Sequence, residues 1–262
     1  MGTQNAFKPA PAWYRGQRWE ELSLGARLNL AFQAAREELP THLPSKELWE
    51  NREFYAQTLD VLCGHFATPV LDEVLDVGGG HGLISLLWLA HGTAQRATIV
   101  DHYEPHSHRL LLAKFLSVVD FEPPTYLHQR LEDVTLLRLP ERSAILGVHC
   151  CGRLTDAVID LALQMRRPFA VLPCCHGAKE RDKEFLAMLK AIAHRKGISF
   201  FDAYDFLRLG RAWAAGWKVY FTSISPTVSP RNNVLIGLPP KDMAERGAEG
   251  KTVDKGTRSG RP

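Results

Sequence analysis

Residues 73–82 read Glu-Val-Leu-Asp-Val-Gly-Gly-Gly-His-Gly. The apolar start of this stretch predicts a buried strand that ends at the first glycine. The glycines at 78, 80 and 82 predict a turn with positive φ, where a Cβ would block the approach of backbone amides to a ligand. A second apolar run, 97–100, ends in Asp101, whose carboxylate can accept hydrogen bonds from both hydroxyls of a ribose. These features predict a strand–helix–strand unit that binds a nucleoside.

The spacing of the glycines narrows the choice of ligand. A dinucleotide site needs Gly-x-Gly-x-x-Gly, and neither register fits, because Leu83 or Ser85 stands in the last position. The sequence instead reads Asp-x-Gly-x-Gly-x-Gly from position 76, which resembles the first motif of class I S-adenosylmethionine-dependent methyltransferases. The resemblance implies S-adenosylmethionine as cofactor, with the Asp76 carboxylate organising the loop and the methionine amino group. The implied cofactor residues are Asp76, Gly78, Gly80, Gly82 and Asp101. A glycine-rich turn that binds nothing is the alternative.

Alternating strand and helix patterns organise the centre of the chain. Strands are expected at 73–77, 97–100, 125–130, 144–149 and 169–172, and helices at 82–91, 107–119, 155–165 and 180–196. Residues 198–211 are expected to form a short strand and a helix. Two further strands, 217–224 and 233–238, are joined by a linker too short for a helical crossover, so they must be antiparallel. The expected fold is α/β: a doubly wound, seven-stranded, mostly parallel, Rossmann-like sheet with an antiparallel last strand, like that of class I methyltransferases.

The chain divides into three expected parts. Residues 1–70 should form a helical cap, in which Ser45 is the predicted N-cap of the second helix. The apolar faces of its two helices are Leu24, Leu28, Phe32 and Ala35, then Leu48, Tyr55, Leu59, Leu62 and Phe66. Trp13, Tyr14, Trp19 and Trp49 are expected to be packing anchors rather than a stacking surface for a base. Residues 71–240 should form the cofactor-binding domain, and the charged segment 241–262 a disordered tail.

The composition of the chain indicates its size class, its charge and the state of its cysteines. A chain of 262 residues with 45% hydrophobic content suits one α/β domain with an appendage. Its net charge is +3, and the tail holds six Lys or Arg against four Asp or Glu, so the body is nearly neutral and lacks a broad electrostatic footprint for nucleic acid. Five cysteines, four of them in adjacent pairs, favour reduced thiols over a disulfide framework. No apolar run is long enough for a membrane span, and we expect a soluble, cytoplasmic protein.

Two further motifs fall at the expected ends of neighbouring strands. Residues 149–156 read His-x-Cys-Gly-x-x-Thr-Asp, and 173–176 read Pro-Cys-Cys-His. They resemble signatures of the PCC-motif methyltransferase family, which is related to eukaryotic tRNA 2′-O-methyltransferases. The resemblance covers about 71–238 and includes Ser-Pro-Arg-Asn at 229–232. It implies RNA as methyl acceptor. A protein side chain or a small metabolite stays open, because the Cys/His-rich accessory modules of the tRNA enzymes have no counterpart in this chain.

The candidate catalytic residues are His149, Asp156, Cys174, Cys175 and His176. His149 or His176 could act as a general base, and Asp156 is a second candidate for proton removal. Three other interpretations stay open: a zinc site, disfavoured because adjacent cysteines point to opposite faces; small buried hydrophobic residues; and a thiolate nucleophile at Cys174. Asp133 is expected to accept a hydrogen bond from the adenine amine. No metal or redox cofactor is required.

The leading hypothesis is therefore direct in-line methyl transfer. Methylation of an exocyclic amine is disfavoured, because no Asn/Asp-Pro-Pro-Tyr motif follows the fourth strand. A nucleoside-binding scaffold without catalysis and a nicotinamide oxidoreductase are the alternatives from other classes.

Overall fold

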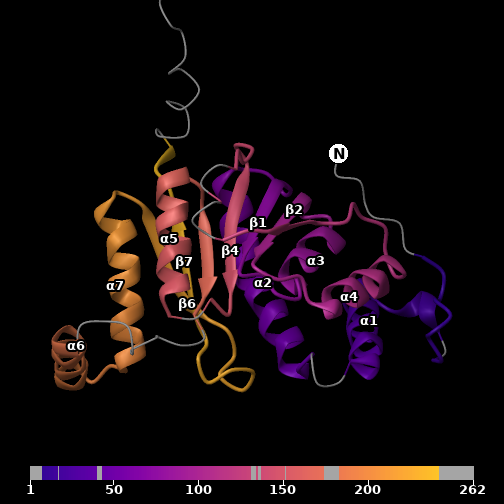
Figure 1. The fold of residues 1–262 in the computed structure, drawn as a ribbon, viewed down its shortest axis with the longest axis horizontal. Helices are drawn as coiled ribbons and strands as arrows, with labels where there is room; N and C mark the ends of the chain where they lie inside the picture. The colour runs from indigo at the N-terminus through magenta and orange to yellow at the C-terminus, as the bar shows by residue number, and fades with distance from the viewer. Residues whose placement is uncertain are drawn as a thin grey trace, which may run out of the picture.

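The computed structural model describes residues 8–16, 18–39, 43–130, 134, 137–150, 152–173 and 183–241. Figure 1 shows a central twisted sheet with helices on both faces. The strands are β1 (Leu71–Val77), β2 (Ala94–Asp101), β3 (Thr125–His128), β4 (Ser143–Val148), β5 (Phe169–Leu172), β6 (Lys218–Ser223) and β7 (Asn233–Leu238). The helices are η1 (Trp19–Glu21), α1 (Leu24–Glu38), α2 (Ser45–His65), α3 (Leu83–Ala90), α4 (His106–Leu116), α5 (Arg153–Met165), α6 (Lys183–Lys196) and α7 (Phe200–Ala214).

The seven strands form one sheet in the order β3-β2-β1-β4-β5-β7-β6. Strands β1 to β5 pair in parallel, whereas β7 is antiparallel to both β5 and β6. The expected fold class is thereby confirmed. Because β1 and β4 lie side by side at the point where the strand order reverses, their carboxyl ends border a crevice, the usual place for a ligand in such sheets.

Helices cover the two faces of the sheet through alternate strand residues. Val74 and Leu146 belong to one apolar cluster with residues of α2 and α3, while Leu75 and Ile145 belong to another with residues of α5 and α7. This alternation is what a strand buried on both faces requires, since successive side chains point in opposite directions. All eight residues of α3 are buried, because this helix lies beneath further helices.

The N-terminal helices pack directly on this sandwich. Leu28 and Phe32 of α1 share a buried cluster with Leu111 and Phe115 of α4. The aromatic residues before α1 belong to the same cluster, and the indole nitrogen of Trp13 donates to Ser117 Oγ at 3.0 Å. Trp13 is therefore a packing anchor, as predicted. The first turns of α2 lie near the carboxyl ends of β1 and β4, and the helix ends shortly before β1 begins.

Two local predictions were wrong. Residues 200–214 form a single helix, α7, and no strand precedes it, because Ser199 caps the helix by accepting the amide hydrogen of Asp202 at 2.9 Å. Ser45 is the first residue of α2 rather than its N-cap, a position taken by Pro44, which contributes no side-chain hydrogen bond. Of the predicted disordered tail, 241–262, residues 242–262 lie outside the described residues, so this prediction stays untested.

Candidate functional site

The turn after β1 has the backbone that its glycines predicted. Gly78, Gly80 and Gly82 have φ values of 67°, 48° and 70°. A Cβ on Gly82 would lie 2.5 Å from Ile99, and one on Gly78 would lie 2.9 Å from Leu154. Around Gly80, in contrast, no heavy atom of the described residues, apart from Gly80 itself and its two chain neighbours, lies within 4 Å of that position. Gly78 and Gly82 thus allow close packing, whereas Gly80 borders open space.

Internal hydrogen bonds hold this turn in shape. The amide of Gly78 donates to the Val100 carbonyl at 2.8 Å, and that of Gly80 donates to Oδ2 of Asp101 at 2.9 Å. The hydroxyl of Tyr126 donates to the Gly80 carbonyl at 3.0 Å. Tyr126 was not predicted as a site residue, because its sequence signal was only its place on an expected strand, which the structure sets next to β2. The amides of these two glycines are thus already bonded within the protein, and the turn is preformed.

Gly79 is a further residue that sequence analysis missed. A Cβ on Gly79 would lie 2.7 Å from Ile99 and 2.8 Å from the carboxyl group of Asp76. The third consecutive glycine in the motif was the available signal. Its lack of a side chain lets the turn fold back over Asp76, so the carboxyl group is enclosed.

Asp76 is buried, with 1% of its surface exposed. The Ser85 hydroxyl donates to Oδ2 at 3.0 Å, but Oδ1 accepts no hydrogen bond from the described part of the chain. Burial raises the pKa of Asp76 to about 7; the negative charge of Asp101 adds to the rise, and hydrogen bonds from Ser85 oppose it. A buried carboxyl oxygen without a donor is costly, and a cationic donor entering the adjacent space would compensate it.

Two hollows meet at Gly78. The inner hollow, of about 200 Å³, is lined by Glu47, Asn51, Asp76, Gly78, Gly79, Gly80, His81, Leu83, Ile84, Val148 and His149. The outer hollow, of about 370 Å³, is lined by Val77, Gly78, Val100, Asp101, His102, Gln129, Arg130 and Leu154. The turn therefore has Asp76 on one side and Asp101 on the other, an arrangement suited to an elongated ligand that carries both a cationic group and a diol.

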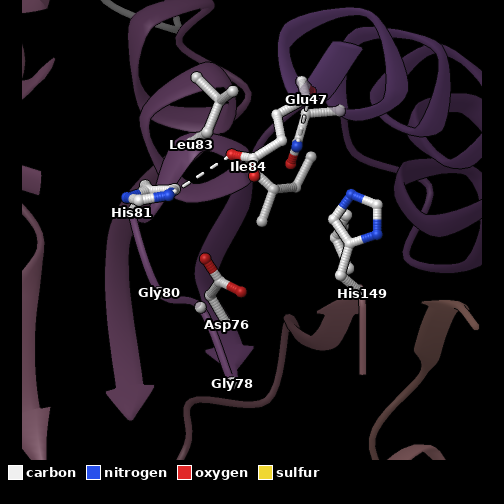
Figure 2. Close-up of a pocket in the computed structure, with 11 residues that line it drawn as sticks. Glu47, Asp76, Gly78, Gly80, His81, Leu83, Ile84 and His149 are labelled. Carbon is white, nitrogen blue, oxygen red and sulfur yellow. Dashed lines mark hydrogen bonds and ion pairs between the residues drawn. The ribbon is translucent and has the colours of Figure 1, made fainter. Parts of the chain in front are cut away.

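Helix α2 forms the far wall of the inner hollow (Figure 2). Oε2 of Glu47 lies 3.6 Å from Nε2 of His81, whose Nδ1 lies 2.5 Å from the Ser107 hydroxyl. Burial raises the pKa of Glu47, although the nearby His149 opposes the rise. Glu47 and Asn51 were not predicted as site residues, because nothing in the local sequence of α2 shows which of its polar residues turns toward β1. His81 was not predicted either, although it lies between the glycines of the 73–82 stretch.

His149 reaches the inner hollow from the turn after β4. Its backbone φ is 60°, in the left-handed region that residues other than glycine rarely adopt. The amide of His149 donates to the Leu172 carbonyl at 3.1 Å, so this motif and the end of β5 adjoin, as predicted. Nε2 of His149 lies 2.9 Å from Oε2 of Glu50. His149 is the predicted catalytic residue that the structure places beside Asp76 and the glycine turn.

Cys150 lies beneath the glycine turn. Its Sγ donates to the Val77 carbonyl at 3.1 Å, and burial, together with the negative charges of Asp76 and Asp101, strongly raises the pKa of the thiol. This cysteine therefore behaves as a small buried side chain, in agreement with one of the four interpretations of the cysteine and histidine motifs.

Asp156 lies outside both hollows. Its Oδ1 is 3.3 Å from Nε of Arg208 and 3.8 Å from Nη1 of Arg211, both on α7. These contacts make Asp156 an anchor between α5 and α7 and do not support its predicted role in proton removal. Within the described ranges, no group of three or more His, Cys, Asp or Glu residues is arranged to hold a metal ion.

Four predicted site residues lie outside the described residues: Asp133, Cys174, Cys175 and His176. Their roles stay predictions. Pro173, which precedes Cys174, lines a third hollow of about 230 Å³ with Asp202, Asp205 and Asn233. None of the described helices has the length and apolar character needed to cross a membrane.

Known proteins with a similar sequence match only part of this chain. No family model matches the chain. A protein from Xenopus laevis named glutathione S-transferase C-terminal domain-containing protein is 29% identical over 121 residues, which cover 36% of this chain and 20% of the relative. Proteins of the same name from Mus musculus and Homo sapiens are 28% and 27% identical over 122 residues, covering 36% of this chain and 19% of each relative. The chain thus spans about a fifth of the length of these relatives.

Solved structures with similar folds are distant in sequence. An O-methyltransferase family protein from Burkholderia thailandensis has a TM-score of 0.41 at 15% identity, covering 78% of this chain and 62% of that one. An rRNA methylase from Streptococcus thermophilus has a TM-score of 0.43 at 16% identity, covering 70% and 94%. Magnesium protoporphyrin IX methyltransferase from Synechocystis PCC 6803, with bound SAH, has a TM-score of 0.42 at 18% identity, covering 73% and 85%. The resemblance to PCC-motif methyltransferases stays a prediction.

Proposed function

We propose that this chain is an S-adenosylmethionine-dependent methyltransferase. The observation that carries the proposal is the pair of carboxylates on either side of the glycine turn. Asp76 has a buried oxygen, at the inner hollow, to which none of the described residues donates, and Asp101 stands at the outer hollow. An ammonium group would satisfy Asp76, and a ribose diol would suit Asp101. S-adenosylmethionine carries both groups and, when bound, supplies a methyl group on a positively charged sulfur.

The residues around the turn would divide the work of holding this cofactor. Asp76 would bind the methionine ammonium and Asp101 the ribose hydroxyls, while the open space beside Gly80 would admit the body of the ligand. Asp133 is the proposed partner of the adenine amine. A nicotinamide dinucleotide also carries a ribose diol, but it has no ammonium group for Asp76.

The inner hollow would serve the transfer mainly by positioning. Glu47 and Asn51 of α2 close one side of it, which limits the access of water. Holding an acceptor in line with the methyl group supplies most of the rate enhancement in a direct displacement. His149 lines the same hollow and is the proposed base, with proton removal as a secondary aid.

RNA is the proposed acceptor. The support is the likeness of residues 149–156 and 173–176 to motifs of enzymes that methylate RNA on the 2′-oxygen. Incubation with radiolabelled S-adenosylmethionine and cell extract, followed by nuclease or protease digestion, tests this assignment. Release of the label by nuclease supports RNA. Release by protease, or label in small molecules, would assign a protein side chain or a metabolite instead.

Calorimetric titration tests the cofactor separately from the acceptor. We expect S-adenosylhomocysteine to bind, NADH not to bind, and Asp76→Asn and Asp101→Asn to weaken binding at least about tenfold, since each loses a charge-assisted hydrogen bond. Asp120→Asn is the control, because Asp120 is exposed and pairs with Lys8. Binding of NADH in place of S-adenosylhomocysteine would overturn the proposal. Binding without transfer to any component of the extract would instead identify a nucleoside-binding scaffold.

A further inference from the structure

Helix α6 carries a local concentration of positive charge that the proposed chemistry has not yet used. Its four Lys or Arg and its one Glu give residues 183–196 a net charge of +3, which equals that of the whole chain, so all other residues together are neutral. The four cations, which we call the α6 cations, are all exposed: Lys183, Lys190, Arg195 and Lys196. Helix α6 thus holds a share of the positive charge far above the share expected from its length.

Basic residues form a row along one flank of α6. Lys183, Lys190 and His194 are spaced by seven and four residues, which places them on the same side of the helix. With a rise of about 1.5 Å per residue, the row extends over about 16 Å. Nζ of Lys190 lies 5.4 Å from the centroid of the Phe200 ring, so this flank borders the first turn of α7. Arg195 follows directly after the end of the row.

The stability of the helix explains only part of this arrangement. Cations in the last turn, such as Arg195 and Lys196, interact favourably with the helix macrodipole. A cation at the first residue, Lys183, interacts unfavourably with it, and Lys190 lies before the last turn. The row therefore contains two lysines whose positions the dipole does not account for.

The α6 cations also differ from other exposed cations in their pairing. Within the ranges that the structure describes, the α6 cations form no ion pair. Arg96 and Arg142, at the amino ends of the strands, pair with Glu73 and Asp72. A surface cation without an acidic partner is available to an external anion, whereas a paired one is already partly neutralised.

Helix α6 lies at the edge of the sheet that carries the inner and outer hollows. Pro173, which follows β5, and Ser199, three residues after the end of α6, line the same third hollow. Figure 1 shows α6 beside the start of α7, at the end of the sheet where α2 begins. The row of basic residues is therefore on the side of the molecule where the proposed transfer takes place.

We propose that α6 binds the phosphate backbone of the RNA that is methylated, with Lys183, Lys190 and Arg195 as phosphate contacts. The inference rests on the proposed transfer to RNA and names the surface that recognises the strand. Lys and Arg that neutralise phosphates release counterions, so this binding is independent of base sequence and weakens with salt. An anionic membrane fits less well, because the large apolar side chains exposed on α6 are only Met188 and Ile192, whereas a helix at a bilayer surface buries a whole apolar face.

Binding of a labelled single-stranded RNA oligonucleotide of mixed sequence tests this surface without any cofactor. The full-length protein is titrated into the RNA at several salt concentrations and fluorescence anisotropy is measured. The α6 variant combines Lys183→Gln, Lys190→Gln and Arg195→Gln. We expect its affinity to fall at least about tenfold and the slope of log K against log salt to shrink by about 2, since each contact to a single strand contributes about 0.7. Failure of the wild-type protein to bind, or an α6 variant with unchanged affinity and slope, would overturn the inference.

A control variant removes the same net charge at the opposite edge of the sheet. It combines Arg96→Gln, Arg142→Gln and Lys218→Gln, which lie at or near the amino ends of β2, β4 and β6. We expect its affinity for RNA and its salt slope to stay close to those of the wild type. Equal losses in the control and in the α6 variant would attribute the effect to net charge alone and would contradict a role for α6.

A charge-conserving variant tests whether the cations themselves are needed. It combines Lys183→Arg, Lys190→Arg and Arg195→Lys, and we expect it to bind RNA like the wild type, because backbone contacts need the charge and not a particular base-reading geometry. Urea unfolding followed by circular dichroism checks that all variants keep the wild-type midpoint. Loss of RNA binding in this variant, at an unchanged midpoint, would count against phosphate contacts on α6.

Methyl transfer separates this inference from the proposed function. For the α6 variant we expect KM for RNA to rise at least about tenfold, with KM for S-adenosylmethionine unchanged. If the α6 variant loses RNA binding but the wild-type protein transfers no methyl group to RNA, the surface stands and the proposed function fails. If the wild-type protein methylates RNA and the α6 variant does so with the same KM, the proposed function stands and the inference falls. Binding through α6 to vesicles that contain phosphatidylserine, with no binding to RNA, would assign the surface to a membrane and would also overturn it.

Discussion

At the scale of single residues, Asp76 links ligand binding to pH. Burial raises its pKa to about 7, so its ionised fraction increases between about pH 6 and pH 8. An ammonium group binds the ionised form, and we expect the affinity for S-adenosylhomocysteine to rise with pH across that window. Calorimetry at pH 6 and pH 8 measures the change. A similar rise in Asp76→Asn would contradict this origin of the pH dependence.

The raised pKa of Asp76 makes the free energy of unfolding fall as pH rises, whereas the affinity for the ligand is expected to increase. The stabilising contribution of protonated Asp76 is complete below its ordinary pKa of 3.8 and is lost as pH rises through about 7. The full difference corresponds to about 4 kcal/mol. Asp76→Asn should therefore gain free energy of unfolding relative to wild type between pH 5 and pH 8. Urea unfolding at both values checks this, with the exposed Asp120→Asn expected to follow wild type. A relative loss at pH 8 would contradict it.

A substitution at Gly80 separates the cost of backbone strain from the loss of ligand binding. Its φ is 48° and the space beside it is open, so Gly80→Ala should cost only about 1–2 kcal/mol of unfolding free energy. The added methyl group would enter the ligand space, and cofactor affinity should fall more than stability does. Gly64→Ala is the control, because Gly64 is helical and, beyond its own helix backbone, no atom of the described residues lies within 4 Å of its Cβ position. That change should raise stability by about 0.5–1 kcal/mol. Unchanged cofactor affinity in Gly80→Ala would place the ligand elsewhere.

At the scale of elements, α2 and α7 support the site from opposite faces of the sheet. Helix α2 brings Glu47 to the inner hollow and Glu50 next to His149, whereas α7 holds Gly152, just before α5, through Arg208. Arg208 is only 2% exposed, and its Nη2 donates to the Gly152 carbonyl at 2.9 Å. Gly152, three residues after His149, is therefore held by a helix that begins about fifty residues later in the chain.

Removing Arg208 should be among the most damaging changes outside the hollows. Its Nη1 donates to Asp205 at 2.9 Å, so Arg208→Met would leave Asp205 and Asp156 without their main buried cation. We expect a loss of about 3–5 kcal/mol of unfolding free energy in urea, because uncompensated buried charges are costly. Arg208→Lys should recover only part of it, since an ammonium lacks the planar fork of donors. Arg211→Ala, at a side chain 44% exposed, should cost less than about 1 kcal/mol. Equal losses would contradict the special role of Arg208.

At the scale of the whole molecule, the N-terminal helices are part of the main apolar core. Leu28 and Phe32 of α1 are buried against α4, and Leu48 of α2 belongs to the same cluster. Deleting α1 would expose this apolar surface on α3 and α4. The predicted division at residue 70 therefore separates the proposed helical cap from the rest of the chain only in sequence order. We do not expect the two parts to fold separately.

Truncation tests this integration. A chain that begins at residue 43, without α1, should lose its cooperative urea transition or aggregate, because several fully buried side chains lose their partners. A chain that ends at residue 241 should unfold like the full-length protein. Circular dichroism during urea unfolding measures both. A cooperative transition of wild-type midpoint in the first truncation would show that the sheet and its remaining helices are stable alone.

Much of the fold could be inferred before any coordinates, because the relevant signals are local. Alternating apolar segments predicted the strand and helix order, and the short link between the last two strands predicted their antiparallel pairing. Gly78, Gly80 and Gly82 predicted positive φ, since this property depends on the residue itself. The same local reasoning failed in residues 198–211, where a short strand was expected before a helix, because Ser199 caps a helix that begins at Phe200.

The contacts between α2 and the turn after β4 depend on long-range packing. Glu50 and His149 are about a hundred residues apart, and their contact exists because α2 packs over the end of β4. No periodicity in the sequence of α2 distinguishes Glu50 from its solvent-exposed neighbours. Likewise, the sequence around Asp156 does not distinguish a carboxylate that pairs with an arginine from one that lines a hollow. The stacking of the layers decides which polar groups meet and which carboxylates are neutralised by an arginine. The physical reason is that burial and charge pairing arise only between elements that the tertiary structure brings together.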